Sequence, residues 1–225
     1  MSNINHEYIQ NYLYGIIPEK DGILKEMEQY AIENNVPIVT PDVAGLMAVL
    51  VKSTGVKTIL EVGTAIGYSS ILMGTHMRYN CGDDFSIVTV EKNEESAEIA
   101  RSNIAKAGMG KNIRVLTGDA GELLDSIEGC FDMIFVDAAK GQYMDFFRQS
   151  IGKLKTGGLF VCDNVLFRGM VAERSLLKRR KITIVKRLKK FLEFISSNES
   201  LQTTIVPMGD GVSISCKLKE VCFND

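Results

Sequence analysis

Short apolar runs alternate with amphipathic stretches along the chain from residue 57 onward. The runs are Thr58–Val62, Ser86–Glu91, Ile113–Thr117, Met133–Asp137 and Leu159–Asp163. In the clearest amphipathic stretch, apolar side chains recur at helical spacing from Ala97 to Ala107, with Asn93 as the cap and Gly108 as the stop. Apolar strands separated by helices predict a parallel sheet that is covered on both faces.

The two ends of the chain follow other patterns. The pattern of residues 1–55 predicts helices, and Thr40-Pro41-Asp42 is typical of the start of a helix. Near the C-terminus, Thr203–Pro207 and Val212–Lys217 flank a Gly-rich turn and read as an antiparallel hairpin. We therefore predict an α/β fold, a doubly wound and mostly parallel seven-stranded sheet with one reversed strand. We expect residues 1–225 to form a single domain, with a helical part over 1–55 and a core over 57–217.

Composition excludes several classes of protein. Of 225 residues, 45% are hydrophobic and 24% charged, which is typical of a globular chain. No apolar run reaches the roughly 18 residues that a membrane span needs, and the first basic residue is Lys20, so no signal peptide is expected. The five Cys are scattered without a CxxC pair, as in a reducing cytosol. We expect a cytoplasmic protein without a membrane partner.

The turn after the first strand carries candidate binding residues. Gly63 and Gly67 allow a tight turn, and Ser69 falls at the start of the next helix, where free N–H groups favour an anionic group. The GxxxG spacing differs from the GxGxxG of dinucleotide binders and lacks the Lys of a P-loop. This argues against an NAD-dependent oxidoreductase, although an ordinary strand-to-helix turn remains an alternative for the glycines.

Two acidic residues follow the next strands. Glu91 ends the second strand, where a carboxylate can accept hydrogen bonds from both hydroxyls of a ribose. An exposed Glu that opens a helix is the alternative. Asp119 follows the third strand, where it could accept from an adenine amino group, cap a helix, or do both.

The strongest group of candidate residues follows strands four and five. Asp137, Asp163 and Asn164 would converge at adjacent strand ends and supply only oxygen ligands, which suits Mg²⁺, Ca²⁺ or Mn²⁺ rather than zinc. Turn and cap roles are the alternative for each residue taken alone. Lys140, one turn beyond Asp137, is a candidate base, because a nearby cation and partial burial favour a neutral amine.

These segments together resemble a known family. Glu61–Ser69, Glu91, Phe135–Lys140 and Leu159–Asn164 resemble the cation-dependent class I O-methyltransferases of the catechol and caffeoyl-CoA type. Further segments are similar to the bacterial tRNA 5-hydroxyuridine methyltransferases, which form 5-methoxyuridine at the wobble position of tRNA. They are Val36–Ile38, Asp137–Tyr143, Asp163–Gly169, Lys178–Lys181 and Ile205–Gly211.

The resemblance implies a Rossmann-like fold, S-adenosylmethionine as methyl donor, Mg²⁺ or Mn²⁺ as cofactor, tRNA as partner and a homodimer. Matched by position, the cofactor would be bound by Val39, Gly63, Ser69, Glu91, Asp119, Ala120 and Asp137. The metal would be bound by Asp137, Asp163 and Asn164, and the catalytic residues would be Lys140 and Asp137. A catechol or a 5-hydroxyuracil can chelate a cation through two neighbouring oxygens, which favours the oxyanion and fixes its direction.

A basic block lies on an otherwise acidic chain. Residues 168–190 hold ten basic side chains and one acidic side chain, Glu173. Residues 182–197 read as an amphipathic helix, whose lysines could simply be solvated. The run Lys178, Arg179, Arg180 and Lys181 follows the strand-five loop, where a phosphate backbone would pass. We therefore expect tRNA as acceptor, with a small catechol or caffeoyl-type acceptor as the alternative.

Overall fold

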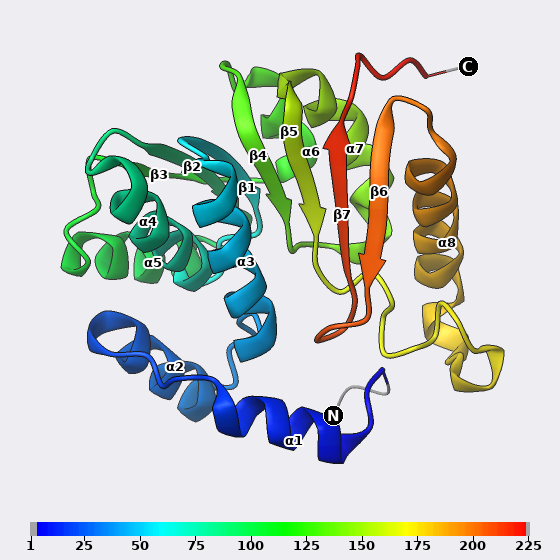
Figure 1. The fold of residues 1–225 in the computed structure, drawn as a ribbon, viewed down its shortest axis with the longest axis horizontal. Coiled ribbons are helices and arrows are strands. Elements are labelled where there is room, and N and C mark those ends of the chain that lie inside the picture. The colour runs from blue at the N-terminus through cyan, green and yellow to red at the C-terminus, as the bar shows by residue number, and fades with distance from the viewer. Residues whose placement is uncertain (1–3, 224–225) are drawn as a thin grey trace. The chain divides into compact units, whose positions relative to one another are not determined.

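The computed structural model describes residues 4–223, whose seven strands form a mixed sheet in the order β3-β2-β1-β4-β5-β7-β6 (Figure 1). The strands are β1 (Thr58–Val62), β2 (Ser86–Glu91), β3 (Ile113–Thr117), β4 (Phe131–Val136), β5 (Leu154–Cys162), β6 (Leu201–Val206) and β7 (Val212–Lys217). The helices are α1 (Glu7–Ile16), α2 (Gly22–Asn34), α3 (Pro41–Thr54), α4 (Tyr68–Cys81), α5 (Glu94–Lys106), α6 (Ala120–Leu123), α7 (Tyr143–Ser150) and α8 (Ile182–Ser197). The predicted fold class is confirmed.

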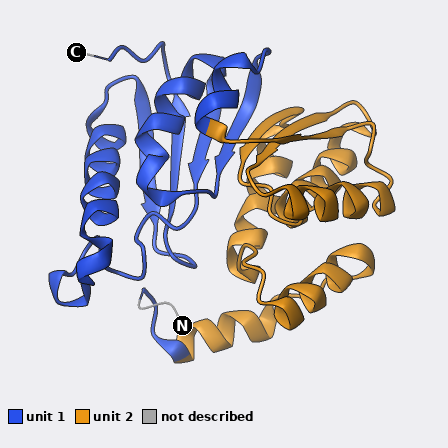
Figure 2. Cartoon of the chain, turned by 180° about the vertical axis from the view of Figure 1, so that it is seen from behind, with its two compact units in different colours: residues 1–7, 121–225 blue, residues 8–120 orange. Residues whose placement is uncertain are grey.

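The chain divides into two compact units (Figure 2). Residues 8–120 form the first, called here the N-terminal unit, and residues 121–225 with residues 1–7 form the second, the C-terminal unit. Residues 8–55 of the predicted helical part and the first three strands lie in the N-terminal unit, whereas β4 to β7 lie in the C-terminal unit.

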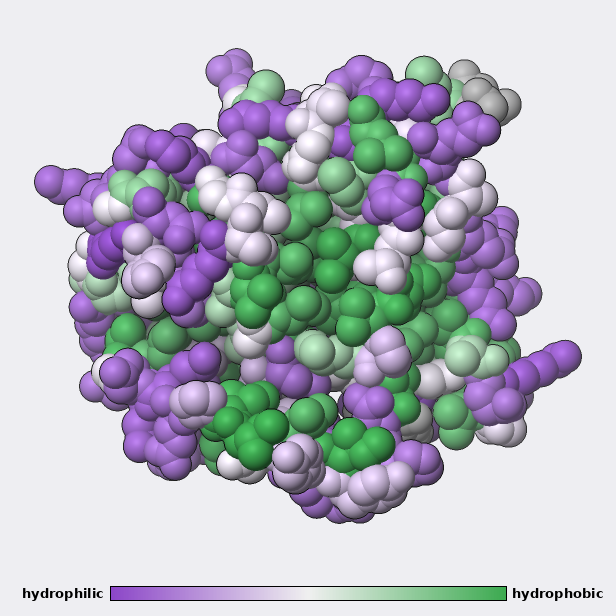
Figure 3. Space-filling model, viewed as in Figure 1, coloured by the Kyte–Doolittle hydropathy of each residue, from purple (hydrophilic) through white to green (hydrophobic). Residues whose placement is uncertain are grey.

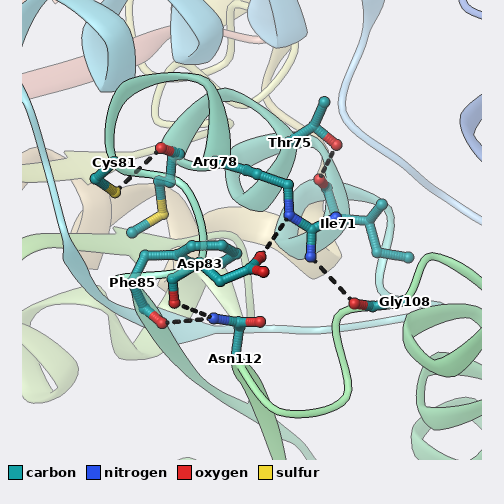
Figure 4. A network of polar contacts seen from close by, with 9 residues as sticks. Ile71, Thr75, Arg78, Cys81, Asp83, Phe85, Gly108 and Asn112 are labelled. Atoms are coloured by element: carbon teal, nitrogen blue, oxygen red, sulfur yellow. Dashed lines mark hydrogen bonds and ion pairs between the residues drawn. The ribbon is translucent and has the colours of Figure 1, made fainter.

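Three parallel strands organise the N-terminal unit, because β2 pairs in parallel with both β1 and β3. Ile59 and Leu60 of β1 and Ile71 of α4 are fully buried, as expected for apolar strands covered by helices. A polar network fixes the connection from α4 to β2 (Figure 4). In it, Arg78 donates to Asp83 at 2.8 Å and to the carbonyl of Gly108 at 3.0 Å.

The C-terminal unit contains the reversed strand. β4 and β5 are parallel, and β7 lies between β5 and β6 and pairs antiparallel with both. Phe147 of α7 contacts Phe160 of β5, with ring centroids 4.9 Å apart, and Phe191 of α8 at 6.1 Å. Figure 3 shows apolar side chains gathered over β5 and β7 and polar side chains along α8. The two helices therefore share an aromatic core with the sheet.

The predicted element bounds agree closely with the structure. β1, β2, β3, β7 and α8 have the bounds that the sequence predicted. The other strands differ from the prediction: β4 begins two residues earlier, β5 five and β6 two, and each of the three ends one residue earlier. Asp137 and Asp163 therefore lie just beyond β4 and β5. Within residues 4–223, no helix is long and apolar enough to cross a membrane.

Candidate active site

The segment between β1 and α4 is a tight loop. Gly63, Ala65 and Gly67 have positive φ angles of 102°, 46° and 88°. Glycine adopts such angles at little cost, whereas Ala65 needs support from its neighbours. A side chain at position 67 would also meet Ala100 of α5 at 3.4 Å. The predicted tight turn is present, and the binding role of Gly63 stays a prediction.

Glu91, the last residue of β2, supports this loop. Its Oε2 accepts a hydrogen bond from the backbone N–H of Ala65 at 2.8 Å, and its Oε1 accepts from the N–H of Asn93 at 2.8 Å. Each carboxylate oxygen can accept more than one hydrogen bond. Glu91 can therefore hold the loop and still accept from the two hydroxyls of a ribose.

Ser69 is the second residue of α4, beside the free N–H groups of the first helical turn. Its hydroxyl donates to Oε1 of Glu61 at 2.5 Å, and both side chains are buried. Sequence reasoning did not single out Glu61 as a functional residue. The available signal was a charged residue inside the otherwise apolar run Thr58–Val62.

The other predicted cofactor residues of the N-terminal unit are Val39, Asp119 and Ala120. Val39 is buried just before α3, and Ala120 is the first residue of α6. Asp119 forms an ion pair with Lys92, with 2.7 Å between Nζ and Oδ2. Because the lysine side chain is 77% exposed, this pair is weak and would not prevent Asp119 from accepting a ligand's amino group.

Asp137, Asp163 and Asn164 come together in the C-terminal unit. Val136 and Cys162 are register partners at the ends of β4 and β5, so the aspartates that follow them lie side by side. The side-chain amide of Asn164 donates to Oδ1 of Asp137 at 3.2 Å, and its backbone N–H donates to Oδ1 of Asp163 at 2.6 Å. The three predicted metal ligands therefore form one cluster.

The two aspartates of this cluster both have raised pKa values. Burial raises the pKa of Asp137, opposed by the positive charge of Lys140. Burial and the neighbouring Asp137 also raise the pKa of Asp163, opposed by the N–H of Asn164 and by Lys140. Asp163 is buried and Asp137 is half-buried, and two such carboxylates side by side would be stabilised in their charged form by a divalent cation. No group of three or more His, Cys, Asp or Glu side chains forms within residues 4–223, so the candidate set consists of two carboxylates and an amide.

Tyr143 fixes the backbone beside this cluster. Its side chain is buried, and its phenol donates to the carbonyl of Asp163 at 2.8 Å. Lys140 begins the short 3₁₀ turn η2 (Lys140–Gln142) that precedes Tyr143. The positive charge of Lys140 lowers the pKa of both aspartates, so the predicted base lies within electrostatic range of the predicted metal ligands.

The loop after Asn164 is held by the turn between β6 and β7. The N–H of Val165 donates to the carbonyl of Gly211 at 2.9 Å, and the N–H of Leu166 to the carbonyl of Asp210 at 3.0 Å. Gly211 has φ +87°, and a Cβ there would collide with Leu166. Asn164 itself has φ +61°, an unusual angle that these contacts support.

The predicted tRNA-binding run, Lys178–Lys181, is exposed and lies between the Asn164 loop and α8. Arg179–Lys181 form the 3₁₀ turn η5, and the ammonium of Lys181 lies 5.8 Å from the ring centroid of Phe167. Among residues 4–223, no ion pair to an acidic side chain involves Lys178, Arg179, Arg180 or Lys181. The run therefore presents cationic groups to solvent.

Known proteins are similar to this chain in sequence and in fold. The chain is 28% identical over 214 residues to a catechol O-methyltransferase of Niastella koreensis, covering 92% of this chain and 93% of that protein. A structure described as that of a candidate caffeoyl-CoA O-methyltransferase from Staphylococcus aureus superposes with a TM-score of 0.85 at 31% identity, covering 94% of this chain and all of the other.

A second structure carries a bound ligand. An O-methyltransferase from Bacillus cereus in complex with SAH superposes with a TM-score of 0.79 at 28% identity, covering 93% of this chain and 97% of the other. The family model described as O-methyltransferase matches residues 16–218. This match spans both units and every strand. The chain belongs to the O-methyltransferase family.

Proposed function

We propose that this chain transfers the methyl group of S-adenosylmethionine to an oxygen of 5-hydroxyuridine in tRNA, at the wobble position, with the help of a divalent cation. The donor is supported by the Bacillus cereus relative, which was crystallised with SAH. The cluster of Asp137, Asp163 and Asn164 supports the cation. The observation that carries the choice of a tRNA acceptor is the exposed run Lys178–Lys181 on the chain segment that follows this cluster.

In this proposal the N-terminal unit holds the nucleoside part of the donor. Glu91 accepts hydrogen bonds from the ribose hydroxyls, while its bonds to Ala65 and Asn93 keep its carboxylate oriented. Asp119 accepts from the adenine amino group after releasing Lys92. Gly63 and Ser69 line the turn that approaches the remainder of the donor.

The C-terminal unit holds the cation and the acceptor. Asp137, Asp163 and Asn164 offer oxygen ligands of the hard type that Mg²⁺ and Mn²⁺ prefer. When bound, such a cation supplies Lewis acidity and fixes the direction of two neighbouring acceptor oxygens. For this step Lys140 must first be in its neutral form. It then accepts the proton of the acceptor hydroxyl, which leaves an oxygen nucleophile for in-line displacement at the sulfonium methyl group, with S-adenosylhomocysteine as the leaving group.

A small catechol or caffeoyl-type acceptor is the second candidate. It is favoured by the printed names of the Niastella koreensis and Staphylococcus aureus relatives. Both acceptor classes have a hydroxyl next to a second oxygen, so the same cation site serves either. The basic run favours tRNA over a catechol. Binding the phosphates of tRNA requires exposed cationic side chains, whereas binding a neutral catechol does not.

One experiment separates the two acceptors. Purified protein with Mg²⁺ and methyl-labelled S-adenosylmethionine is offered either tRNA from cells lacking the protein or a catechol, and the products are resolved by nucleoside analysis. We expect 5-hydroxyuridine in the tRNA before the reaction and labelled 5-methoxyuridine after it. Unlabelled tRNA together with a labelled catechol would contradict the tRNA acceptor and favour the small one.

A further inference from the structure

The loop at residues 164–169, called here the Asn164 loop, has an unusual backbone. Three consecutive residues are left-handed, with φ angles of 46° at Phe167, 57° at Arg168 and 78° at Gly169. Residues other than glycine adopt such angles at a cost in free energy and keep them only where the surrounding structure enforces them. Because the loop begins at a predicted metal ligand, the contacts that hold the loop also hold that ligand.

The carboxylate of Asp210 supports this conformation. Asp210 lies in the turn between β6 and β7, and its Oδ1 accepts a hydrogen bond from the backbone N–H of Arg168, the middle residue of the three. The backbone bonds from Val165 to Gly211 and from Leu166 to Asp210 connect the same turn to the start of the loop. The side chain of Asp210 therefore extends this connection to the left-handed residues.

Asp210 is half-buried and lies near the predicted metal ligands. Burial and the neighbouring Asp137 chiefly raise the pKa of Asp163, and the negative charge of Asp210 adds to this rise. Asp210 does not complete a ligand group of three carboxylates with these two aspartates, because no such group forms among residues 4–223. Its printed contact is instead the bond to the N–H of Arg168, which points to a role through the loop.

We infer that Asp210 is a positioning residue for the cation and the acceptor, because its carboxylate holds the Asn164 loop in the conformation that keeps Asn164 beside Asp137. The inference rests on the proposed function, since it takes a divalent cation as the ligand of this cluster. Without the bond from Arg168, the left-handed residues relax and the amide of Asn164 loses its place. The affinity for a divalent cation should then fall roughly tenfold, the size of one lost hydrogen bond to a charged group.

The test separates the hydrogen bond of Asp210 from its charge. Asp210→Asn keeps an oxygen that can accept from the N–H of Arg168 and removes the charge, whereas Asp210→Glu keeps the charge and moves the acceptor by one methylene group. Asp210→Ala removes both. Binding of Mn²⁺ to the full chain is measured by electron paramagnetic resonance in the presence of S-adenosylhomocysteine, whose own affinity is measured by calorimetry.

We expect Asp210→Asn to bind Mn²⁺ like the wild type, and Asp210→Ala and Asp210→Glu to bind it roughly tenfold more weakly. The KM for tRNA should rise in the two weak variants, while the affinity for S-adenosylhomocysteine stays unchanged. If Asp210→Ala fails to fold, the comparison of Asp210→Asn with Asp210→Glu decides. Weak binding by Asp210→Asn with normal binding by Asp210→Glu would assign the effect to charge and overturn the inference.

Asn198→Ala is the matched control. The side chain of Asn198 is also half-buried in the C-terminal unit, and its oxygen accepts from the backbone N–H of Ser200 at 2.8 Å. This variant should bind Mn²⁺ normally, and losses of Mn²⁺ affinity that simply follow the melting temperature across all variants would overturn the inference. Equal Mn²⁺ binding by the wild type and Asp210→Ala would overturn the inference alone, whereas a wild type that binds no Mn²⁺ would contradict the proposed cation as well.

Discussion

Asn164 and Asp137 share a hydrogen bond of 3.2 Å although 27 residues separate them in the sequence. Asp137 follows β4 and Asn164 follows Asp163 after β5, and the parallel pairing of these strands brings the two residues together. The bond uses the amide nitrogen of Asn164. A cation would be bound by the amide oxygen instead. Rotating the Asn164 amide group by half a turn would place its oxygen where its nitrogen now lies.

Loss of one aspartate should abolish metal-dependent activity without unfolding the protein. Asp163 lies beyond the end of β5 and its carboxylate contributes no apolar packing, so Asp163→Ala should fold and be inactive. Mg²⁺ should raise the melting temperature of the wild type but not that of the variant. Asp145→Ala, at an exposed position of α7, serves as the control. Full activity of Asp163→Ala, or of the wild type in excess EDTA, would remove the cation from the proposal.

Glu91 should contribute strongly to donor binding. Its removal takes away an acceptor for the ribose and the support of the Ala65 N–H, so Glu91→Ala should weaken S-adenosylhomocysteine binding by about 1.5–3 kcal/mol. Calorimetry at constant pH measures the change. Glu95→Ala, at an exposed position in the first turn of α5, is the matched control. Unchanged affinity in Glu91→Ala would place this carboxylate outside the site.

His76 should make the protein sensitive to mild acid. Partial burial, together with the positive charges of Lys52 and Lys20, lowers the pKa of His76 below its ordinary value of 6.5. The folded protein therefore favours the neutral imidazole, and the unfolded chain binds the proton more readily. Stability is retained above pH 6.5 and is lost as the pH falls from 6.5 towards the lowered pKa.

The check on His76 is a comparison of urea unfolding at pH 7.5 and pH 5.5. His76→Gln should lose less free energy of unfolding between these two pH values than the wild type does. The exposed His6 provides the matched control, His6→Gln. An identical loss in the wild type and His76→Gln would show that other groups set the acid sensitivity.

The basic run should make tRNA binding sensitive to salt. Each phosphate contact releases counterions, so changing Arg179, Arg180 and Lys181 together to Ala should flatten the log–log salt dependence of tRNA affinity by roughly 2–3 units. Changing the exposed Lys186, Lys189 and Lys190 of α8 removes the same charge and serves as the control. Equal slopes in the wild type and the Arg179–Lys181 variant would show that the run is solvated and does not contact tRNA. The proposal of a small acceptor would then be favoured over that of tRNA.

Most of the fold could be predicted from the sequence because its strands are short and apolar throughout. Such runs have few alternative pairings, so β1, β2 and β3 have the predicted bounds. The side-chain contacts of the helix starts were harder to predict. Thr40 precedes α3 as predicted, but its hydroxyl donates to Asp42 at 2.5 Å rather than capping the helix. Local sequence does not show whether a hydroxyl will accept from a backbone N–H or donate to a nearby carboxylate.

The candidate site was predicted in part for a similar reason. Asp137, Asp163 and Asn164 could be placed together because strand ends of a parallel sheet meet at one edge. The hydrogen-bond partners of Glu61 could not be predicted, since they are hydroxyls from α4 and β2 that converge only in the folded chain. The division into two units depends on packing between segments that are distant in the sequence. The periodicity of apolar and polar residues does not predict such packing.

The position of β7 has a consequence for synthesis of the protein on the ribosome. Strand β7, residues 212–217, pairs with β5 on one side and with β6 on the other. While the chain emerges in order, β5 therefore has an unpaired edge until residues 212–217 have left the exit tunnel. An open edge of this kind invites pairing with other chains. A nascent chain that stalls before residue 212 should therefore be prone to aggregation and be a client for chaperones.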